Sequence, residues 1–323
     1  MNRLLTTLGL VLLAQIVLAA GLSMGASSTG ELAPGEPLLQ FDPATVDHIV
    51  IAAPGKDPLV LAKHGKAWRL PKYFGLPAAS RKVEAFAGRL AGLKPRLPVA
   101  TTSDAATRFK VSADHYARKI TLDAGGQTMA TLYLGEADGA RRTYARVAGS
   151  NAVYDIDLGA YEAGAKPTDW SDPNLLHLNE ADITRVQLHG ITLERHKHQW
   201  RVDGLGKGKV TDQDQATTLL DQLANLSYLA VLGTKDQADY HQSKPALKFT
   251  VDTKSGKSLS YVFSKPAKGD DYVLKTSARE FYFKVPKYAV KDLLNASRDK
   301  LARAKGQSKA SRHAGAATSG GAS

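Results

Sequence analysis

The sequence is 323 residues long, 43% hydrophobic and 23% charged, which is close to the composition of ordinary globular proteins. We therefore expect most of the chain to fold, and the length suggests about two domains. The absence of cysteine excludes disulfides, thiolate metal sites and a cysteine nucleophile. The formal net charge of +12 predicts attraction to anionic partners, such as lipid headgroups or envelope polymers.

The N-terminal residues 1–22 have the pattern of a membrane anchor or a secretory signal. Arg3 provides a short positive flank, and residues 4–22 are apolar apart from two threonines and one glutamine. As a helix this run would span roughly 28 Å, about the thickness of a bilayer core. We favour a retained anchor over a cleaved signal, because the apolar core of a signal is usually about 7–15 residues long. The positive flank then predicts an inner-membrane protein with a single N-terminal anchor and the bulk of the chain in the periplasm.

Two further segments look irregular. Residues 23–37 are small, polar and rich in Pro and Gly, which is typical of a flexible tether. Residues 298–323 are rich in Lys, Arg, Ala, Ser and Gly, and Leu301 is their only large apolar residue. We predict that they form a disordered basic tail, which either attracts anionic lipids or polymers or only increases solubility.

The region between these segments contains an internal repeat. Residues 38–51 (LLQFDPATVDHIVI) and 175–188 (LLHLNEADITRVQL) have apolar residues at matching positions, at an offset of 137 residues. Trp68 and Trp200 then correspond at an offset of 132. Such self-similarity indicates tandem copies of one domain. We predict a first copy over residues 38–166 and a second over residues 167–297.

Each copy is expected to contain a strand, a hairpin, an amphipathic helix, a short helical turn and two further hairpins. In the first copy the strands are expected at residues 46–52, 58–64, 66–70, 119–123, 128–134, 143–148 and 152–156. In the second copy they are expected at residues 183–188, 191–202, 247–251, 259–263, 272–275 and 281–284. Because hairpins predominate and no strand-helix-strand rhythm is present, we predict an α+β fold with mainly antiparallel sheets.

The helices have recognisable start signals. Ser80 is placed to cap a helix that buries Val83, Phe86 and Leu90, and Thr211 is placed to cap its counterpart in the second copy. Residues 102–104 resemble a second cap in the first copy. Because Asp104 recurs as Asp236, we expect both residues to serve folding.

Few sequence patterns indicate a catalytic or ligand-binding site. Pairs of acids that would suit a hydrolase with two carboxylates occur at Glu31/Glu36, Asp155/Asp157 and Asp270/Asp271, of which only the middle pair is placed to share a strand-end face. Three histidines could share a metal, but the neighbouring Arg195 and Lys197 oppose a cation there; they are His189, His196 and His198. Residues 204–209 contain glycines and lysines without the spacing of a phosphate-binding loop. We therefore assign no catalytic, cofactor-binding or metal-binding residue and predict that the protein is not an enzyme.

Several residues together resemble a known family. They are the two openings at residues 38–51 and 175–188, the hairpin Trp68, Leu90 and Leu93 at the helix end, residues 103–104, residues 119–122 (KITL) before Gly125-Gly126, Leu134-Gly135, and residues 169–176 (DWSDPNLL). This pattern, from about Leu38 to Asn295, resembles the domain of unknown function 4340 family. The resemblance implies a single-anchor envelope protein associated with an ABC transport system of the gliding-motility type, beside its permease and its large auxiliary subunit. The family has no agreed catalytic residues, so none is carried over.

These observations lead to three hypotheses. The first is a non-enzymatic, membrane-tethered periplasmic accessory or scaffold protein of an ABC-type transport system. The second is a binding module for an anionic envelope polymer or lipid, and the third is a hydrolase that uses Asp155 and Asp157. We expect no cofactor, and no nucleic-acid partner, because an exported protein seldom meets nucleic acid.

Overall fold

The computed structural model describes residues 35–137 and 141–306, which divide into two units, Met1–Ser171 and Asp172–Ser323. The predicted anchor at residues 1–22, most of the predicted tether and residues 307–323 of the predicted tail lie outside the described residues. In the part of the chain that is described, no helix is long and apolar enough to cross a bilayer.

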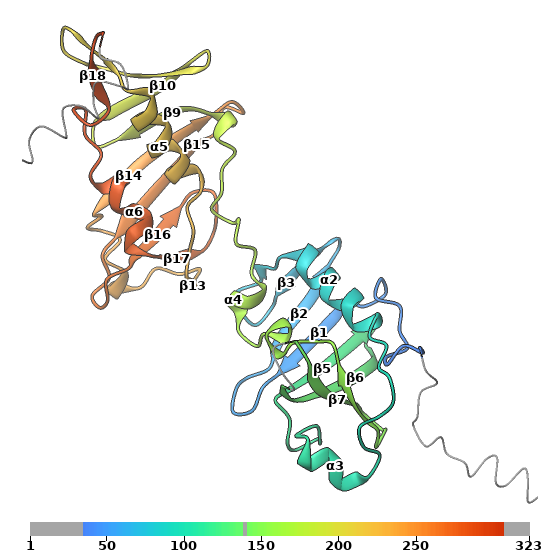
Figure 1. The fold of residues 1–323 in the computed structure, drawn as a ribbon. Helices are drawn as coiled ribbons and strands as arrows, with labels where there is room; N and C mark the ends of the chain where they lie inside the picture. The colour runs from blue at the N-terminus through green and yellow to red at the C-terminus, as the bar shows by residue number, and fades with distance from the viewer. Residues whose placement is uncertain (1–34, 138–140, 307–323) are drawn as a thin grey trace, which may run out of the picture. The chain divides into compact units, whose positions relative to one another are not determined.

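The first unit is built on an eight-stranded sheet with the strand order β4-β3-β2-β1-β5-β6-β7-β8 (Figure 1). Every neighbouring pair is antiparallel. The strands are β1 (His48–Ala52), β2 (Leu59–His64), β3 (Ala67–Leu70), β4 (Leu76–Pro77), β5 (Arg118–Ala124), β6 (Gln127–Ala137), β7 (Thr143–Val147) and β8 (Val153–Ile156).

The second unit has its own eight-stranded antiparallel sheet, in the order β11-β10-β9-β14-β15-β16-β17-β13. Its strands are β9 (Ile183–Leu188), β10 (Ile191–His196), β11 (Gln199–Val202), β13 (Ala230–Gly233), β14 (Leu247–Thr253), β15 (Ser258–Ser264), β16 (Tyr272–Thr276) and β17 (Tyr282–Val285). A separate two-stranded ribbon pairs β12 (Lys209–Thr211) with β18 (Ala302–Ala304). The predicted α+β class with mainly antiparallel sheets is confirmed.

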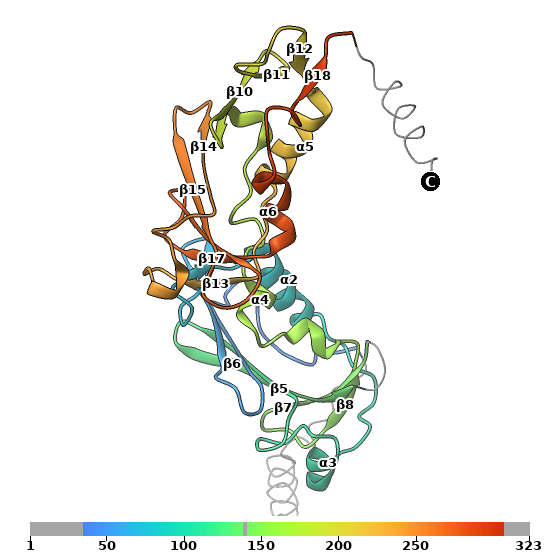
Figure 2. The same cartoon turned by 90° about the vertical axis from the view of Figure 1, so that its left-hand side faces the viewer.

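Each sheet is covered on one face by a helix (Figures 1 and 2). This helix follows the hairpin β2–β3 in the first unit and the hairpin β10–β11 in the second. In the first unit this is α2 (Ser80–Ala91), whose buried side includes Val83, Phe86 and Leu90, as the apolar spacing predicts. In the second unit α5 (Gln213–Ala224) and α6 (Lys287–Leu294) lie together on the sheet. The shorter helical segments are α3 (Ser103–Arg108), α4 (Pro167–Trp170), η1 (Ala160–Ala163), η2 (Glu180–Asp182) and η3 (Ala238–Tyr240).

The predicted helix caps are wrong, because the expected residues bond to neighbouring strands. Ser80 Oγ accepts the main-chain N–H of Trp68 at 3.0 Å, and Thr211 Oγ1 accepts that of Val202 at 2.8 Å. The N-cap of α5 is Asp212, whose carboxylate accepts the N–H of Gln215 at 3.3 Å. No side chain caps α3, where Asp104 lies in the first helical turn.

A strap of chain near the end of each unit binds the start of the covering helix. The N–H of Ala79 donates to the carbonyl of Trp170 at 2.8 Å, and the N–H of Asp212 donates to that of Leu301 at 2.9 Å. Trp170 and Leu301 are both buried, so each fills the core beneath its strap. The first unit therefore ends at Ser171, beyond the predicted boundary at residue 166. The prediction that the chain is disordered from residue 298 is also wrong for residues 298–306, which contain β18.

Candidate functional site

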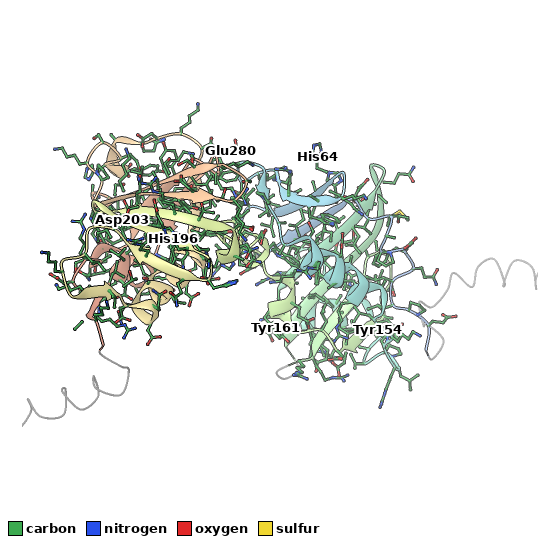
Figure 3. The ribbon with its side chains drawn as sticks, turned by 90° about the horizontal axis from the view of Figure 1, so that it is seen from above. His64, Tyr154, Tyr161, His196, Asp203 and Glu280 are labelled. Carbon is green, nitrogen blue, oxygen red and sulfur yellow. The ribbon has the colours of Figure 1, made fainter. Side chains whose placement is uncertain are left out.

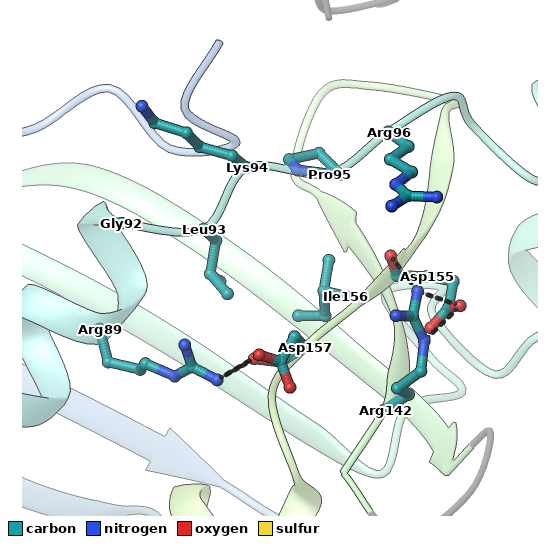
Figure 4. A pocket seen from close by; sticks show the side chains of 10 residues that line it. All are labelled: Arg89, Gly92, Leu93, Lys94, Pro95, Arg96, Arg142, Asp155, Ile156 and Asp157. Carbon is teal, nitrogen blue, oxygen red and sulfur yellow. Dashed lines mark hydrogen bonds and ion pairs between the residues drawn. The ribbon is translucent and has the colours of Figure 1, made fainter. Parts of the chain in front are cut away.

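A hollow of the first unit lies between the end of α2 and β8 (Figure 4). Its volume is about 350 Å³, near the lower end of the range of about 300–1,000 Å³ found for small-ligand sites. Its wall contains four cationic side chains and two acids; the lining residues are Arg89, Gly92, Leu93, Lys94, Pro95, Arg96, Arg142, Asp155, Ile156 and Asp157.

One wall of the hollow holds an ion pair between α2 and the end of β8. Arg89 Nη2 lies 3.0 Å from Asp157 Oδ2 and also donates to the main-chain carbonyl of Asp157. Hydrogen bonding to Arg89 lowers the pKa of Asp157, and the same bond raises the pKa of Arg89. Asp157 is therefore held as a carboxylate with a cationic partner.

The other wall holds a second ion pair, between the residue before β7 and β8. Arg142 Nε donates to Asp155 Oδ2 at 2.7 Å, and Arg142 Nη2 contacts the same oxygen and lies 3.4 Å from the main-chain carbonyl of Asp155. Asp155 Oδ1 is buried and has no hydrogen-bond partner among the described residues. The predicted acidic pair thus does lie in one hollow, with each acid bound to its own arginine.

This arrangement favours binding over acid catalysis. A glycoside hydrolase needs one protonated carboxyl group as well as one carboxylate. Arg89 holds Asp157 ionised, and the guanidinium of Arg142 occupies one oxygen of Asp155. The surplus cations at the rim are Lys94 and Arg96, neither of which forms an ion pair with another of residues 35–137 and 141–306. The hollow therefore suits a ligand with acidic groups better than it suits a bond-breaking reaction.

The other acidic pairs do not gather into a site. Asp270 pairs with Lys265 at 3.5 Å, and Asp271 pairs with Lys284 at 3.2 Å. Glu31 lies outside the described residues. The acids that line the hollow could be identified from the sequence, but Arg89 and Arg96 could not, because they come from α2 and from the segment that follows it.

The three histidines considered as metal ligands lie at the two turns on either side of β10, with His189 before the strand and His196 and His198 at its end. His196 ends β10, as labelled in Figure 3, and its Nε2 is 3.8 Å from Glu194 Oε2. His189 occupies a turn with φ of 50°, and Lys197 occupies the next turn with φ of 56°. Across residues 35–137 and 141–306, no group of three potential ligands is placed to hold a metal ion.

A second basic surface forms where residues 204–209 meet the strap of the second unit, residues 298–306. Lys305 N–H donates to the carbonyl of Gly208 at 2.8 Å, and Lys209 pairs with Asp299 at 2.8 Å. We call residues 204–209 and 298–306 the basic ribbon; it has six cationic side chains and one acid. Two segments that are about 90 residues apart in sequence thus form one surface.

Comparisons with known proteins agree with the resemblance seen in the sequence. The model of the family described as "Domain of unknown function (DUF4340)" matches residues 68–245, more than half of the chain, and the match runs from the first hairpin of one unit into the other. No curated protein and no solved structure matches the chain. The protein is therefore a member of the DUF4340 family.

Proposed function

We propose that this protein is a non-enzymatic accessory protein of the cell envelope, in which two related domains bind partner proteins of an ABC-type transport system. The proposal includes the anchor expected from residues 1–22 and a periplasmic location for both domains. It also includes a duplication, in which the two units are tandem copies of one domain.

The duplication is supported by bonds that recur at matching places. Strands β3-β2-β1-β5-β6-β7-β8 and β11-β10-β9-β14-β15-β16-β17 follow one another in the same order. The start of each covering helix accepts the N–H of the hairpin tryptophan, through Ser80 in one unit and Gln213 in the other. The straps described above also recur. These shared residues serve the architecture, so function must depend on residues that differ.

The observation that carries the proposal is a reversal of charge between the two units. Arg142 and Asp155 form an ion pair between the last two strands of the first sheet. At the matching place in the second sheet the pair is Asp271 and Lys284, with the signs exchanged. A shared frame in which the positive and negative positions are exchanged suits a scaffold that binds two different partner surfaces, because the pattern of complementary charge determines which partner is accepted.

Co-purification of the full chain tests this proposal. A C-terminally tagged protein, extracted in a mild detergent, should bring down the permease and the large auxiliary subunit of the transporter in a constant ratio. A strain that expresses the tag alone provides the background. Recovery of the chain alone, under extraction that keeps permease and ATPase together, would contradict the proposal.

A second candidate function is binding of an anionic envelope polymer or lipid, which the basic ribbon favours. Such binding should weaken steeply as salt rises from about 0.05 to 0.5 M, because screening shortens the range of the attraction. The matched variants are Lys300→Glu in the ribbon and Lys63→Glu in the first unit, of which only the first should weaken binding. Equal binding by both variants would remove this candidate.

A further inference from the structure

The outer edge of the first sheet is only partly covered. The N–H of Val153 donates to the carbonyl of Ala100, and the N–H of Val99 donates to that of Val153, both at 2.8 Å. Main-chain groups in an antiparallel strand alternate between its two sides, so the N–H and C=O of Asp155 point to the same outer edge as those of Val153. Beyond Val153, β8 forms no main-chain pairing on this side with the described residues.

The second unit has a strand at the matching place. There β13 (Ala230–Gly233) pairs along the outer edge of β17, with Ala230 opposite Lys284. The N–H of Leu229 donates to the carbonyl of Lys284 at 2.7 Å. Lys284 corresponds to Asp155, because each is the third residue of the last hairpin strand and each forms the cross-strand ion pair. The outer edge of β17 is thus paired with β13, whereas the outer edge of β8 is open beyond Val153.

Two prolines lie in the segment of the first unit that borders this open edge. Pro95 and Pro98 have no N–H to donate to a neighbouring strand, and both lie in the segment that follows α2. The carbonyl of Asp155 instead lies 3.4 Å from Arg142 Nη2. The hollow of about 350 Å³ lies at this gap (Figure 4).

The surroundings of the gap favour an acidic, partly apolar ligand. Asp155 and Asp157 already have arginine partners, which leaves Lys94 and Arg96 as surplus cations on the rim. Leu97 is 76% exposed and Val99 is 46% exposed, although both belong to the segment that borders the gap. An unpaired strand edge beside exposed apolar residues is a typical place for an added strand.

We propose that this gap receives an extended acidic peptide segment of a partner protein, which adds to the outer edge of β8 as one further strand. The segment accepts a hydrogen bond from the N–H of Asp155, in the mode known as β-augmentation. Its side chains alternate between two faces, so that acidic residues on one face meet Arg96. This inference rests on the proposed function and names the part of the first unit that recognises the partner.

A defined peptide tests the electrostatic part of the proposal. The probe is a fluorescent eight-residue peptide of alternating Glu and Val, titrated with the full chain and followed by anisotropy. Arg96→Glu should weaken binding by at least about tenfold, because it reverses a rim charge. Lys207→Glu, which makes the same charge change in the second unit, should leave the affinity unchanged. Equal loss in both variants, or equal binding of an alternating Lys-Val peptide, would overturn the proposal.

A second pair of variants tests the main-chain part. Asp155→Pro and Asp155→Ala both remove the carboxylate, but only proline removes the outward N–H, and proline is tolerated on an edge strand when its N–H side faces solvent. Asp155→Pro should weaken binding by about tenfold or more, whereas Asp155→Ala should bind at least as tightly as the unaltered chain. Equal affinities of the two variants would overturn the proposal.

Amide hydrogen exchange gives a readout that does not depend on variants. Binding of the Glu-Val peptide should slow exchange at Asp155, and a polyglutamate control should slow it less. Unchanged exchange at Asp155 would overturn the proposal, as would an amide already protected in the full chain and exposed by deletion of residues 23–34. If the chain co-purifies with transporter subunits and Arg96→Glu does not change their recovery, this inference fails while the proposed function stands.

Discussion

The main-chain N–H of Trp68 donates a hydrogen bond of 3.0 Å to Oγ of Ser80, the first residue of α2. In the second unit the N–H of Trp200 donates to Gln213 Oε1 at 2.8 Å, and Gln213 Nε2 donates back to the carbonyl of Trp200 at 2.7 Å. Both tryptophans are buried. Each hairpin is therefore fixed to its covering helix by the helix's first side chain, with a serine in one unit and a glutamine in the other.

Ser80→Ala should lower the free energy of unfolding of the first unit by about 1–3 kcal/mol, because it leaves the part-buried N–H of Trp68 without its partner. Ser103→Ala is the matched control: Ser103 also begins a helix, and it should change stability by less than about 0.5 kcal/mol. Urea unfolding of both variants provides the measurement. A shift for Ser103→Ala as large as that for Ser80→Ala would show that the bond to Trp68 is not the cause.

The same serine shows a limit of sequence reasoning. The amphipathic spacing of α2 and the positions of the main strands could be predicted, because they depend on local periodicity. The role of Ser80 could not be predicted, because its hydroxyl could accept a hydrogen bond either from a nearby N–H of the helix or from a strand twelve residues away. The predicted cap at Thr211 is wrong for the same reason. Tertiary contacts decide such choices.

The candidate site was predictable only in part. Asp155 and Asp157 could be picked out as neighbours on a strand, but their arginine partners come from other elements. The incomplete edge of the first sheet becomes visible only by comparison with β13 in the other unit. Strand order is a long-range property that composition does not encode.

The strap formed by residues 298–306 should be essential for the stability of the second unit. Truncation after Ser297 removes β18 and the buried Leu301, whereas truncation after Gly306 keeps both. Leu301→Ala should lower the free energy of unfolding by about 2–5 kcal/mol, as large-to-small changes in a core do. Thermal unfolding should show a strong loss of stability for the first truncation and for Leu301→Ala. A normal transition for the chain that ends at Ser297 would contradict the role of the strap.

The acidic and basic residues of the ion pair between Asp271 and Lys284 should be exchangeable with little loss of stability. Lys284→Asp places two acids together on neighbouring strands and should lower stability by roughly 0.5–1 kcal/mol. Adding Asp271→Lys restores opposite charges, with the signs that the first unit uses, and should recover most of that loss. A double-mutant cycle measured by urea unfolding checks this expectation. Independent, additive effects of the two changes would mean that the pair does not interact.

Stability of the second unit should fall at high pH because of Tyr261. Its ring stacks on Phe249 with centroids 4.7 Å apart, and burial raises the pKa of Tyr261 from 10.0 to about 12. Between these values the unfolded chain releases a proton that the folded unit keeps. The contribution of this group is therefore fully present below pH 10 and is lost as the pH rises toward 12.

Tyr261→Phe should make the urea midpoint of the second unit fall less steeply over this pH interval. Loss of the bond between Tyr261 and Thr276 lowers the midpoint at every pH below the interval, so the slope is the informative quantity. Tyr288→Phe is the control, because Tyr288 is 71% exposed and should keep the slope of the unaltered chain. If both variants follow the unaltered protein from pH 10 to 12, burial of the Tyr261 hydroxyl does not cause the alkaline loss of stability.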